Sequence, residues 1–251
     1  MTYDRYHIAY TPHPKTTLWK RGAAWFAYNA ATNEKPTKVI KCGLPDKMHE
    51  QIVAPARRKG FNAPFYPAFR LRSDATLNDL KLYLERLCSS QTPFNSGVMK
   101  VGIHSNHIYI EPLSQNKTIE ELASNCVYLF DTLREKSQPI PVNGRMKTAL
   151  TQRQIDNFVK WGHPYLFEDY KFSIQLTGPL QEKVANQLCT FLQNQFVNDL
   201  THGVMINGLS LFGQESPEKP ARLLCFSPFK QQSTADPSPI NPAATAALTI
   251  E

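Results

Sequence analysis

The sequence has 251 residues, of which 41% are hydrophobic and 11% aromatic, and this composition excludes a globally disordered or collagen-like chain. Its 28 Lys and Arg against 21 Asp and Glu give a net charge of +7, which favours an anionic partner such as a phosphorylated metabolite, a nucleotide, a nucleic acid or an acidic membrane surface.

Five cysteines are scattered without a Cys-x-x-Cys pair, so we expect reduced thiols in a cytoplasmic protein. No stretch approaches 18 consecutive apolar residues, and the amino terminus lacks an apolar run of signal-peptide length. The sequence therefore predicts neither secretion nor a membrane span.

In chain order, alternating or apolar runs predict strands at 6–10, 98–103, 107–110, 171–177, 204–211 and 223–226. Helical spacing predicts four helices, beginning at Thr76, at the capping boxes Thr118-x-x-Glu121 and Thr151-x-x-Gln154, and near Val184. Because helices and strands mix without strict β-α-β repetition, we expect an α+β fold with antiparallel pairing.

The last 21 residues, 231–251, contain five Ala, three Pro and no Lys or Arg. Such a segment buries too little apolar surface to offset its ordering entropy, so we expect a disordered tail. The folded domain is then 1–230, with 28 positive and 19 negative groups and a net charge of +9.

Two segments, 60–71 and 171–178, share a pattern that suits two strands separated by nearly half of the domain. Alternate side chains of a strand face the same way, so Asn62 and Pro64 are expected on one surface, and Ser173 and Gln175 on another. This arrangement is typical of a duplicated, two-lobed fold.

The chain resembles the two-histidine (2H) phosphoesterase superfamily, and within it the phosphonate-operon-associated branch. The likeness extends over most of residues 5–228 and rests on an ordered series of segments: YHIAYTP (6–12), LWKRGAAW (18–25), PARRKGF (55–61), PAFRL (67–71), LTQRQ (150–154), WGHPY (161–165) and FSIQLTG (172–178).

The resemblance implies two antiparallel sheets that face each other across a central cleft, with helices outside and one His-x-Thr/Ser motif in each lobe. It implies that one imidazole removes a proton from the attacking oxygen while the other protonates the leaving oxygen, and that the hydroxyls hold the phosphate. It implies a link to phosphonate metabolism. We expect neither a metal nor a cofactor.

All four motif positions depart from this pattern. Asn62-Ala-Pro64 and Ser173-Ile-Gln175 stand where the two motifs are expected, so both histidines are missing. Asn62 does not titrate and Pro64 has no donor, while Ser173 and Gln175 offer only neutral hydrogen-bonding groups. Because loss of one general acid–base group costs about 10² to 10⁴ in rate, we expect a catalytically degenerate homologue.

Other residues are candidates for the same cleft. Arg57, Arg58 and Lys59 precede the first motif and Arg70 and Arg72 follow it, so they form either a phosphate-attracting rim or a solvated helix end. The remaining candidates are Tyr66 and Tyr165, which could stack on a base or sugar, and His163 and His7, which could replace the missing pair. His104-x-x-His107 is interpreted as a turn between strands, because no third metal ligand of suitable spacing follows.

Three functions remain open at this point. The first is a pseudoenzyme that binds a phosphorylated or nucleotide-like ligand. The second is an active phosphodiesterase-type hydrolase with a rearranged site in which His163 or His7 carries the proton. The third is a basic RNA-binding or scaffold protein, whose affinity for single-stranded RNA would fall steeply with salt.

Overall fold

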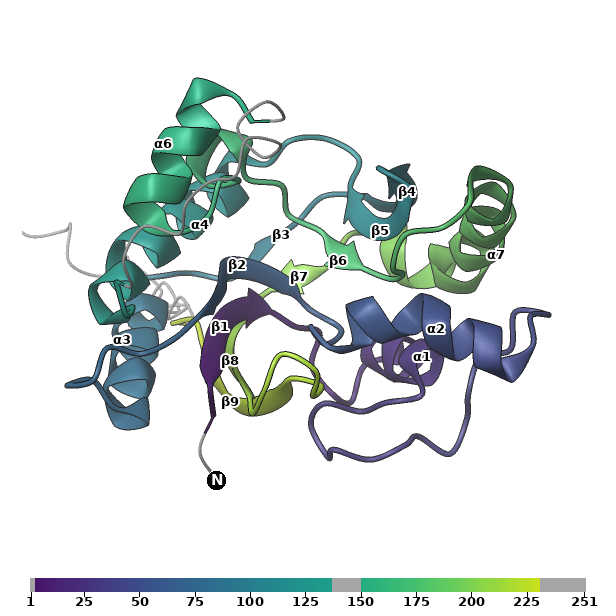
Figure 1. Ribbon diagram of the computed structural model, residues 1–251, viewed down its shortest axis with the longest axis horizontal. Coiled ribbons are helices and arrows are strands. Elements are labelled where there is room, and N and C mark those ends of the chain that lie inside the picture. Colours follow the sequence, from purple (N-terminus) through teal and green to yellow (C-terminus); the bar gives the residue numbers. More distant parts are fainter. Residues whose placement is uncertain (1–2, 137–149, 231–251) are drawn as a thin grey trace, which may run out of the picture.

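The structure is a computed structural model that describes residues 3–136 and 150–230. It is an α+β fold with antiparallel sheets, and helices surround the sheets (Figure 1). This confirms the predicted fold class. The expected tail, 231–251, lies outside the described residues.

A four-stranded antiparallel sheet occupies the middle of the molecule, in the order β2-β1-β8-β9. Its strands are β1 (Arg5–Tyr10), β2 (Ala63–Phe69), β8 (Gly208–Gln214) and β9 (Arg222–Pro228). β1 lies between two partners, which explains why five of its six residues are buried. The pairing of β1 with β2 shifts register on both sides of Ile8.

A second antiparallel sheet has the order β4-β5-β6 and consists of β4 (Met99–His104), β5 (His107–Pro112) and β6 (Ile174–Gln175). β4 and β5 form a hairpin whose two turn residues, Ser105 and Asn106, have positive φ, as a two-residue type I′ turn requires. The predicted turn between His104 and His107 is thereby confirmed. A short pair joins β3 (Phe94–Asn95) to β7 (Met205–Ile206).

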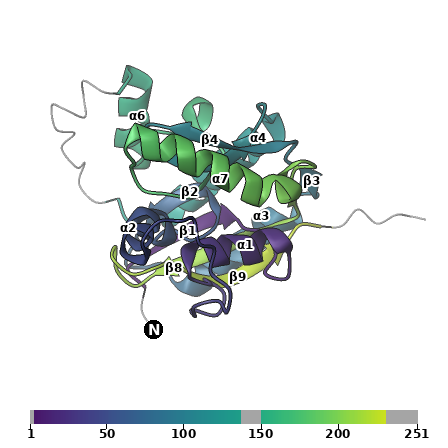
Figure 2. The same cartoon turned by 90° about the vertical axis from the view of Figure 1, so that its right-hand side faces the viewer.

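The helices cover both sheets (Figure 2). They are α1 (Thr17–Phe26), α2 (Asp46–Arg57), α3 (Leu77–Ser89), α4 (Lys117–Phe130), α6 (Gln152–Trp161) and α7 (Glu182–Leu200), with 3₁₀ turns η1 (Asp131–Leu133) and η2 (Phe167–Asp169). α7 packs on β4 and β5, α3 on β8 and β9, and α4 on β2.

The α1, α3, α4 and α6 helices start at side-chain caps, with one correction to the prediction. The helices after Thr76 and Thr151 both begin with complete capping boxes. The α4 helix, however, is capped by Asn116, whose Oδ1 accepts from the Ile119 amide at 3.3 Å. Thr118 therefore lies inside the first turn and is not the cap.

Two predicted strands are also corrected. Of the segment 171–177, only Ile174 and Gln175 pair with β5. The predicted strand 204–211 is divided at Asn207, whose carbonyl accepts from the Phe229 amide, so β7 and β8 pair with different partners.

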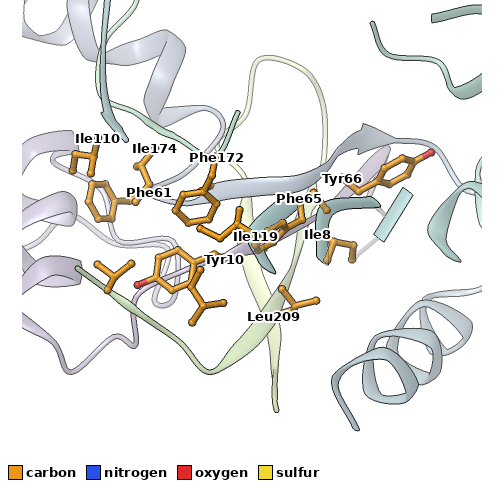
Figure 3. Packing of buried hydrophobic residues seen from close by; sticks show 14 of the residues in the cluster. Ile8, Tyr10, Phe61, Phe65, Tyr66, Ile110, Ile119, Phe172, Ile174 and Leu209 are labelled. Carbon is orange, nitrogen blue, oxygen red and sulfur yellow. The ribbon is translucent and has the colours of Figure 1, made fainter. Parts of the chain in front are cut away.

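The main hydrophobic core lies between the sheets and helices (Figure 3), and a smaller cluster that includes Trp19 and Phe212 is separate from it. Ile8 and Tyr10 of the four-stranded sheet belong to the same cluster as Ile110 and Ile174 of the second sheet. Phe65 connects them, because its ring lies 5.6 Å from that of Phe172, which precedes β6. Removal of this apolar surface from water is the main stabilising contribution that holds the two sheets together.

Candidate functional site

A cavity of about 560 Å³ opens beside β1, β2 and β6, within the size range of small-molecule sites. Its wall comes from segments far apart in the sequence: His7, Arg58, Lys59, Gly60, Asn62, Pro64, Phe65, Pro67, Ala68, Tyr109, His163, Tyr165, Leu166, Tyr170, Lys171, Ser173, Gln175 and Gln214.

The first wall follows the end of α2. Lys59 and Gly60 form a tight turn in which their amides donate to the carbonyls of Ala56 and Arg57. Gly60 has a φ of +89°, a conformation that side chains with a Cβ rarely adopt. This turn places Asn62 at the entrance to β2 with only 3% of its surface exposed.

The second wall is the segment between α6 and β6. Buried Asn157 donates to the carbonyls of Pro164 and Leu166, and Asp169 binds Arg153 through an ion pair of 2.7 Å. The Tyr170 hydroxyl donates to the Pro64 carbonyl at 3.1 Å and so ties this wall to β2. The segment is therefore held from both sides.

α2 and the segment that contains β6 are joined directly beside the pocket. The Gly178 amide donates to the Ile52 carbonyl at 2.7 Å, and a Cβ at Gly178 would come within 2.7 Å of the Pro55 ring. This close approach allows Lys59 Nζ to donate to Gln175 Oε1 at 2.7 Å. Gln175 Nε2 donates in turn to the Thr177 carbonyl, which fixes the amide orientation.

The charge of the lining has one sign. Arg58, Lys59 and Lys171 contribute three cations, and the described lining contains no Asp or Glu. None of these three side chains forms an ion pair with a carboxylate in residues 3–136 and 150–230. Burial lowers the pKa of Lys59, which indicates that its ammonium is partly removed from water. The three cations therefore give the pocket lining a positive charge.

Two imidazoles also line the pocket, and both are neutral at pH 7. Burial, opposed by hydrogen bonding to Asn62 and assisted by Lys59, lowers the pKa of His7 to about 4. Burial and the charge of Lys59 lower the pKa of His163 to about 4 as well. The ring of His7 stacks on Phe212 with centroids 4.8 Å apart, which holds its plane.

The structure brings together most of the residues predicted for the site. The lining contains Asn62, Pro64, Ser173, Gln175, Arg58, Tyr165, His163 and His7. The two motif segments, 60–71 and 171–178, thus meet at one pocket.

Four predicted residues point elsewhere. Arg57 forms an ion pair with Glu50 on α2, Arg70 binds Asp4 at 2.9 Å, and Arg72 binds Asp74 at 2.9 Å. Tyr66 is 1% exposed and its hydroxyl donates to Asp131 at 3.1 Å, on the side of β2 that packs against α4. All four residues lie outside the pocket lining.

Sequence reasoning missed Lys171, Tyr109, Tyr170 and Gln214. Lys171 precedes Ser173 by two residues, so the same alternation that selected Ser173 could have found it. Tyr109 and Gln214 reach the pocket through strand register: Tyr109 pairs with Gln175, and Gln214 pairs with Arg5. That register is not readable from a single sequence.

Fold and site together define an α+β protein with a pocket, lined by three cations, at the meeting point of two antiparallel sheets. The chain belongs to the family described as "Protein of unknown function (DUF1045)", whose model matches residues 63–222.

Two relatives carry the name "Ribose 1,5-bisphosphate phosphokinase PhnN". The protein of Janthinobacterium sp. (strain Marseille) is 27% identical over 186 residues, which are 74% of this chain and 41% of the relative. The protein of Laribacter hongkongensis (strain HLHK9) is 26% identical over 178 residues, 71% of this chain and 41% of the relative. The chain thus spans about two fifths of the length of the curated relatives it matches.

Within residues 3–136 and 150–230, no three His, Cys, Asp or Glu side chains come together in a way that could hold a metal ion. No helix in the same part of the chain is long and apolar enough to cross a bilayer.

Proposed function

We propose that the pocket binds a phosphorylated organic ligand and that the chain is a catalytically degenerate 2H phosphoesterase homologue. The observation that carries the proposal is the lining itself, in which Arg58, Lys59 and Lys171 face the cavity without a compensating carboxylate. Arginine and lysine bind phosphate through charge-assisted hydrogen bonds, and Asn62 and Ser173 add neutral polar groups.

The two-lobed domain 1–230 is part of this proposal, as is the link to phosphonate metabolism that the resemblance implies. The antiparallel sheets on either side of the pocket support it. The names of the relatives add a phosphorylated ribose as a ligand class, since they name ribose 1,5-bisphosphate.

We do not extend the kinase activity in those names to this chain. More than half of each relative lies outside the match. The present sequence also has no Gly-Lys dipeptide, and hence no G-x-x-x-x-G-K-[ST] loop of the type that cradles nucleotide phosphates.

Calorimetric titration with inorganic pyrophosphate tests the binding proposal. We expect saturable binding whose affinity falls as sodium chloride is raised, because the attraction is electrostatic and partly screened. Arg58→Gln and Lys171→Gln should each weaken binding several-fold. Lys183→Gln, on the exposed side of α7, is the matched control and should bind like the unaltered protein. Absence of pyrophosphate binding would contradict the proposal.

The second candidate function is hydrolysis of a cyclic phosphate or phosphodiester by a rearranged site. It is favoured by the presence of His7 and His163 in the same pocket. A water oxygen would bond to phosphorus as the ester P–O bond breaks; one imidazole would take the water proton and the other would supply one to the leaving oxygen. Both rings are neutral at pH 7, so the second must first gain a proton, which a bound anion favours.

Turnover of a panel of nucleoside 2′,3′-cyclic phosphates decides this second candidate. We expect any activity to fall at least tenfold in folded His163→Ala and His7→Ala variants, because each removes one proton-transfer group. His202→Ala, at an exposed position, serves as the control. An unaltered protein without turnover, or histidine variants with full turnover, would argue against the hydrolase.

A further inference from the structure

Asn62 and His7 form a buried polar pair at the pocket, and attraction of a phosphate does not explain why the two are paired. Asn62 is 3% exposed and His7 is 6% exposed, and both side chains line the cavity. They come from different elements, the turn after α2 and the strand β1. Buried polar side chains of this kind are normally hydrogen-bonded.

The orientation of the Asn62 amide is fixed by the backbone. Its Nδ2 donates to the Lys59 carbonyl oxygen at 2.8 Å. A carbonyl only accepts, so the NH₂ group must face it and Oδ1 must point away. Gly60 leaves room for this amide, because a Cβ there would lie 2.8 Å from Nδ2.

Two buried atoms of the pair are left without a partner. Asn62 Oδ1 and His7 Nε2 are both shielded from water, and neither meets strict hydrogen-bond geometry with any group in the described residues. The two side chains lie close together, because the position of a Cβ at Gly60 is 2.8 Å from Asn62 Nδ2 and 3.5 Å from the Phe212 ring, on which His7 stacks with centroids 4.8 Å apart. A carbonyl oxygen and a ring N–H are complementary, so a small rotation satisfies both atoms.

We infer that Asn62 is a positioning residue for His7: the Lys59 carbonyl fixes the Asn62 amide, and Asn62 Oδ1 accepts the Nε2 proton of His7. This bond selects the tautomer with the proton on Nε2, since each ring nitrogen of a neutral imidazole is either donor or acceptor. Nδ1, the nitrogen that is not shielded, then presents a lone pair to the pocket. The stack on Phe212 holds the ring in this plane.

The charges around the ring maintain the neutral form. Arg58 and Lys59 face the pocket from the end of α2, and Lys171 and neutral His163 face it from the segment before β6. The other titratable groups of the lining are the phenols of Tyr109, Tyr165 and Tyr170. No carboxylate of the described lining stabilises an imidazolium at His7, so Nδ1 remains an acceptor.

This acceptor narrows the ligand class, on the condition that the proposed phosphate binding is correct. A fully ionised phosphate only accepts hydrogen bonds, so it would bind to the cationic side chains of the lining. Nδ1 of His7, by contrast, requires a hydrogen-bond donor. A hydroxyl group beside the phosphate supplies it. The pair thus assigns the pocket to a hydroxylated organic phosphate, such as a sugar or polyol phosphate, in preference to an alkyl phosphate.

Nitrogen NMR of the isotope-labelled, unaltered protein tests the tautomer without any variant. We expect the His7 proton on Nε2 and a pyridine-like Nδ1, and an Asn62→Leu variant should lose this bias. Asn62→Asp should raise the pKa of His7, because a carboxylate stabilises the imidazolium. If Asn62 only filled space, Asn62→Leu would leave the tautomer of His7 unchanged. A proton found on Nδ1 in the unaltered protein would overturn the inference.

Paired ligands test the hydroxyl requirement. Glycerol 3-phosphate should bind about tenfold more tightly than propyl phosphate, because the propyl compound leaves the acceptor unpaired. His7→Phe keeps the stacking ring but removes the acceptor, and it should abolish this preference. Equal affinities for the two compounds in the unaltered protein would overturn the inference and leave phosphate binding standing. Failure of both compounds to bind would instead contradict the proposed function, and the NMR signal would still decide the tautomer.

Discussion

Replacement of Lys59 by Glu is expected to weaken pyrophosphate binding at least a hundredfold. The substitution changes the net charge of the lining residues from +3 to +1 and introduces a carboxylate where the ligand phosphate is expected. At an effective dielectric constant of about 20, two charges about 4 Å apart interact by about 4 kcal/mol. The change from attraction to repulsion therefore costs more binding free energy than the new side chain can recover by moving away. Calorimetry at constant ionic strength measures the effect.

Lys47→Glu provides the matched control. This substitution makes the same change in charge at an exposed position of α2, and Lys47 lies outside the pocket lining. If the two variants bind pyrophosphate equally well, the overall charge of the protein attracts the ligand and the pocket assignment is wrong. Unfolding midpoints of both variants should be compared with that of the unaltered protein, because Lys59→Glu also removes the hydrogen bond to Gln175.

Acidification is expected to destabilise the fold through His7. The pKa of His7 is about 4 in the folded protein, compared with an ordinary value of 6.5. Between these values the unfolded chain binds a proton that the folded chain does not, so the stability that depends on neutral His7 is full above pH 6.5. It is lost progressively as the pH falls toward 4. One group with this shift contributes about 3 kcal/mol.

Urea unfolding at pH 7 and pH 4 measures this contribution. The unaltered protein should lose more stability between the two pH values than a His7→Phe variant does, because the variant has no imidazole to protonate. The comparison cancels the effect of carboxylates, which both proteins share. His202→Phe removes an exposed ring and should keep the acid sensitivity of the unaltered protein. Identical pH dependence in all three proteins would show that His7 titrates normally.

Local alternation predicts that Asn62 shares a face with Pro64 and that Ser173 shares a face with Gln175, whereas the meeting of the two segments was expected from the family resemblance. Asn62 and Pro64, like Ser173 and Gln175, are two residues apart and reach the same pocket. Tyr66 follows the same spacing from Pro64 but faces Asp131. The reason is the register shift of β1 against β2 around Ile8, which turns the strand and cannot be read from one sequence.

The helices α1 and α2 show a different limit of sequence reasoning. Pro45 begins α2 without a side-chain cap, and Pro55 lies within its last turn, so the usual start and interior signals are missing. α1 has a Thr16 cap but an interior Gly22, which it needs because a Cβ there would overlap the Phe61 ring. Tertiary contact, more than local propensity, defines both helices, and α2 is the helix that orients Arg58 and Lys59.

The hydrogen bond between Lys59 and Gln175 joins residues 116 positions apart, and the remaining wall extends from His7 to Gln214. The pocket is therefore formed by nearly the whole described chain and by no shorter fragment. Contacts of such sequence separation form late and slowly in folding. A ligand of this pocket would bind the complete fold and not partly folded forms. Its binding would therefore raise the free energy of unfolding of the whole described chain, by an amount that increases with ligand concentration.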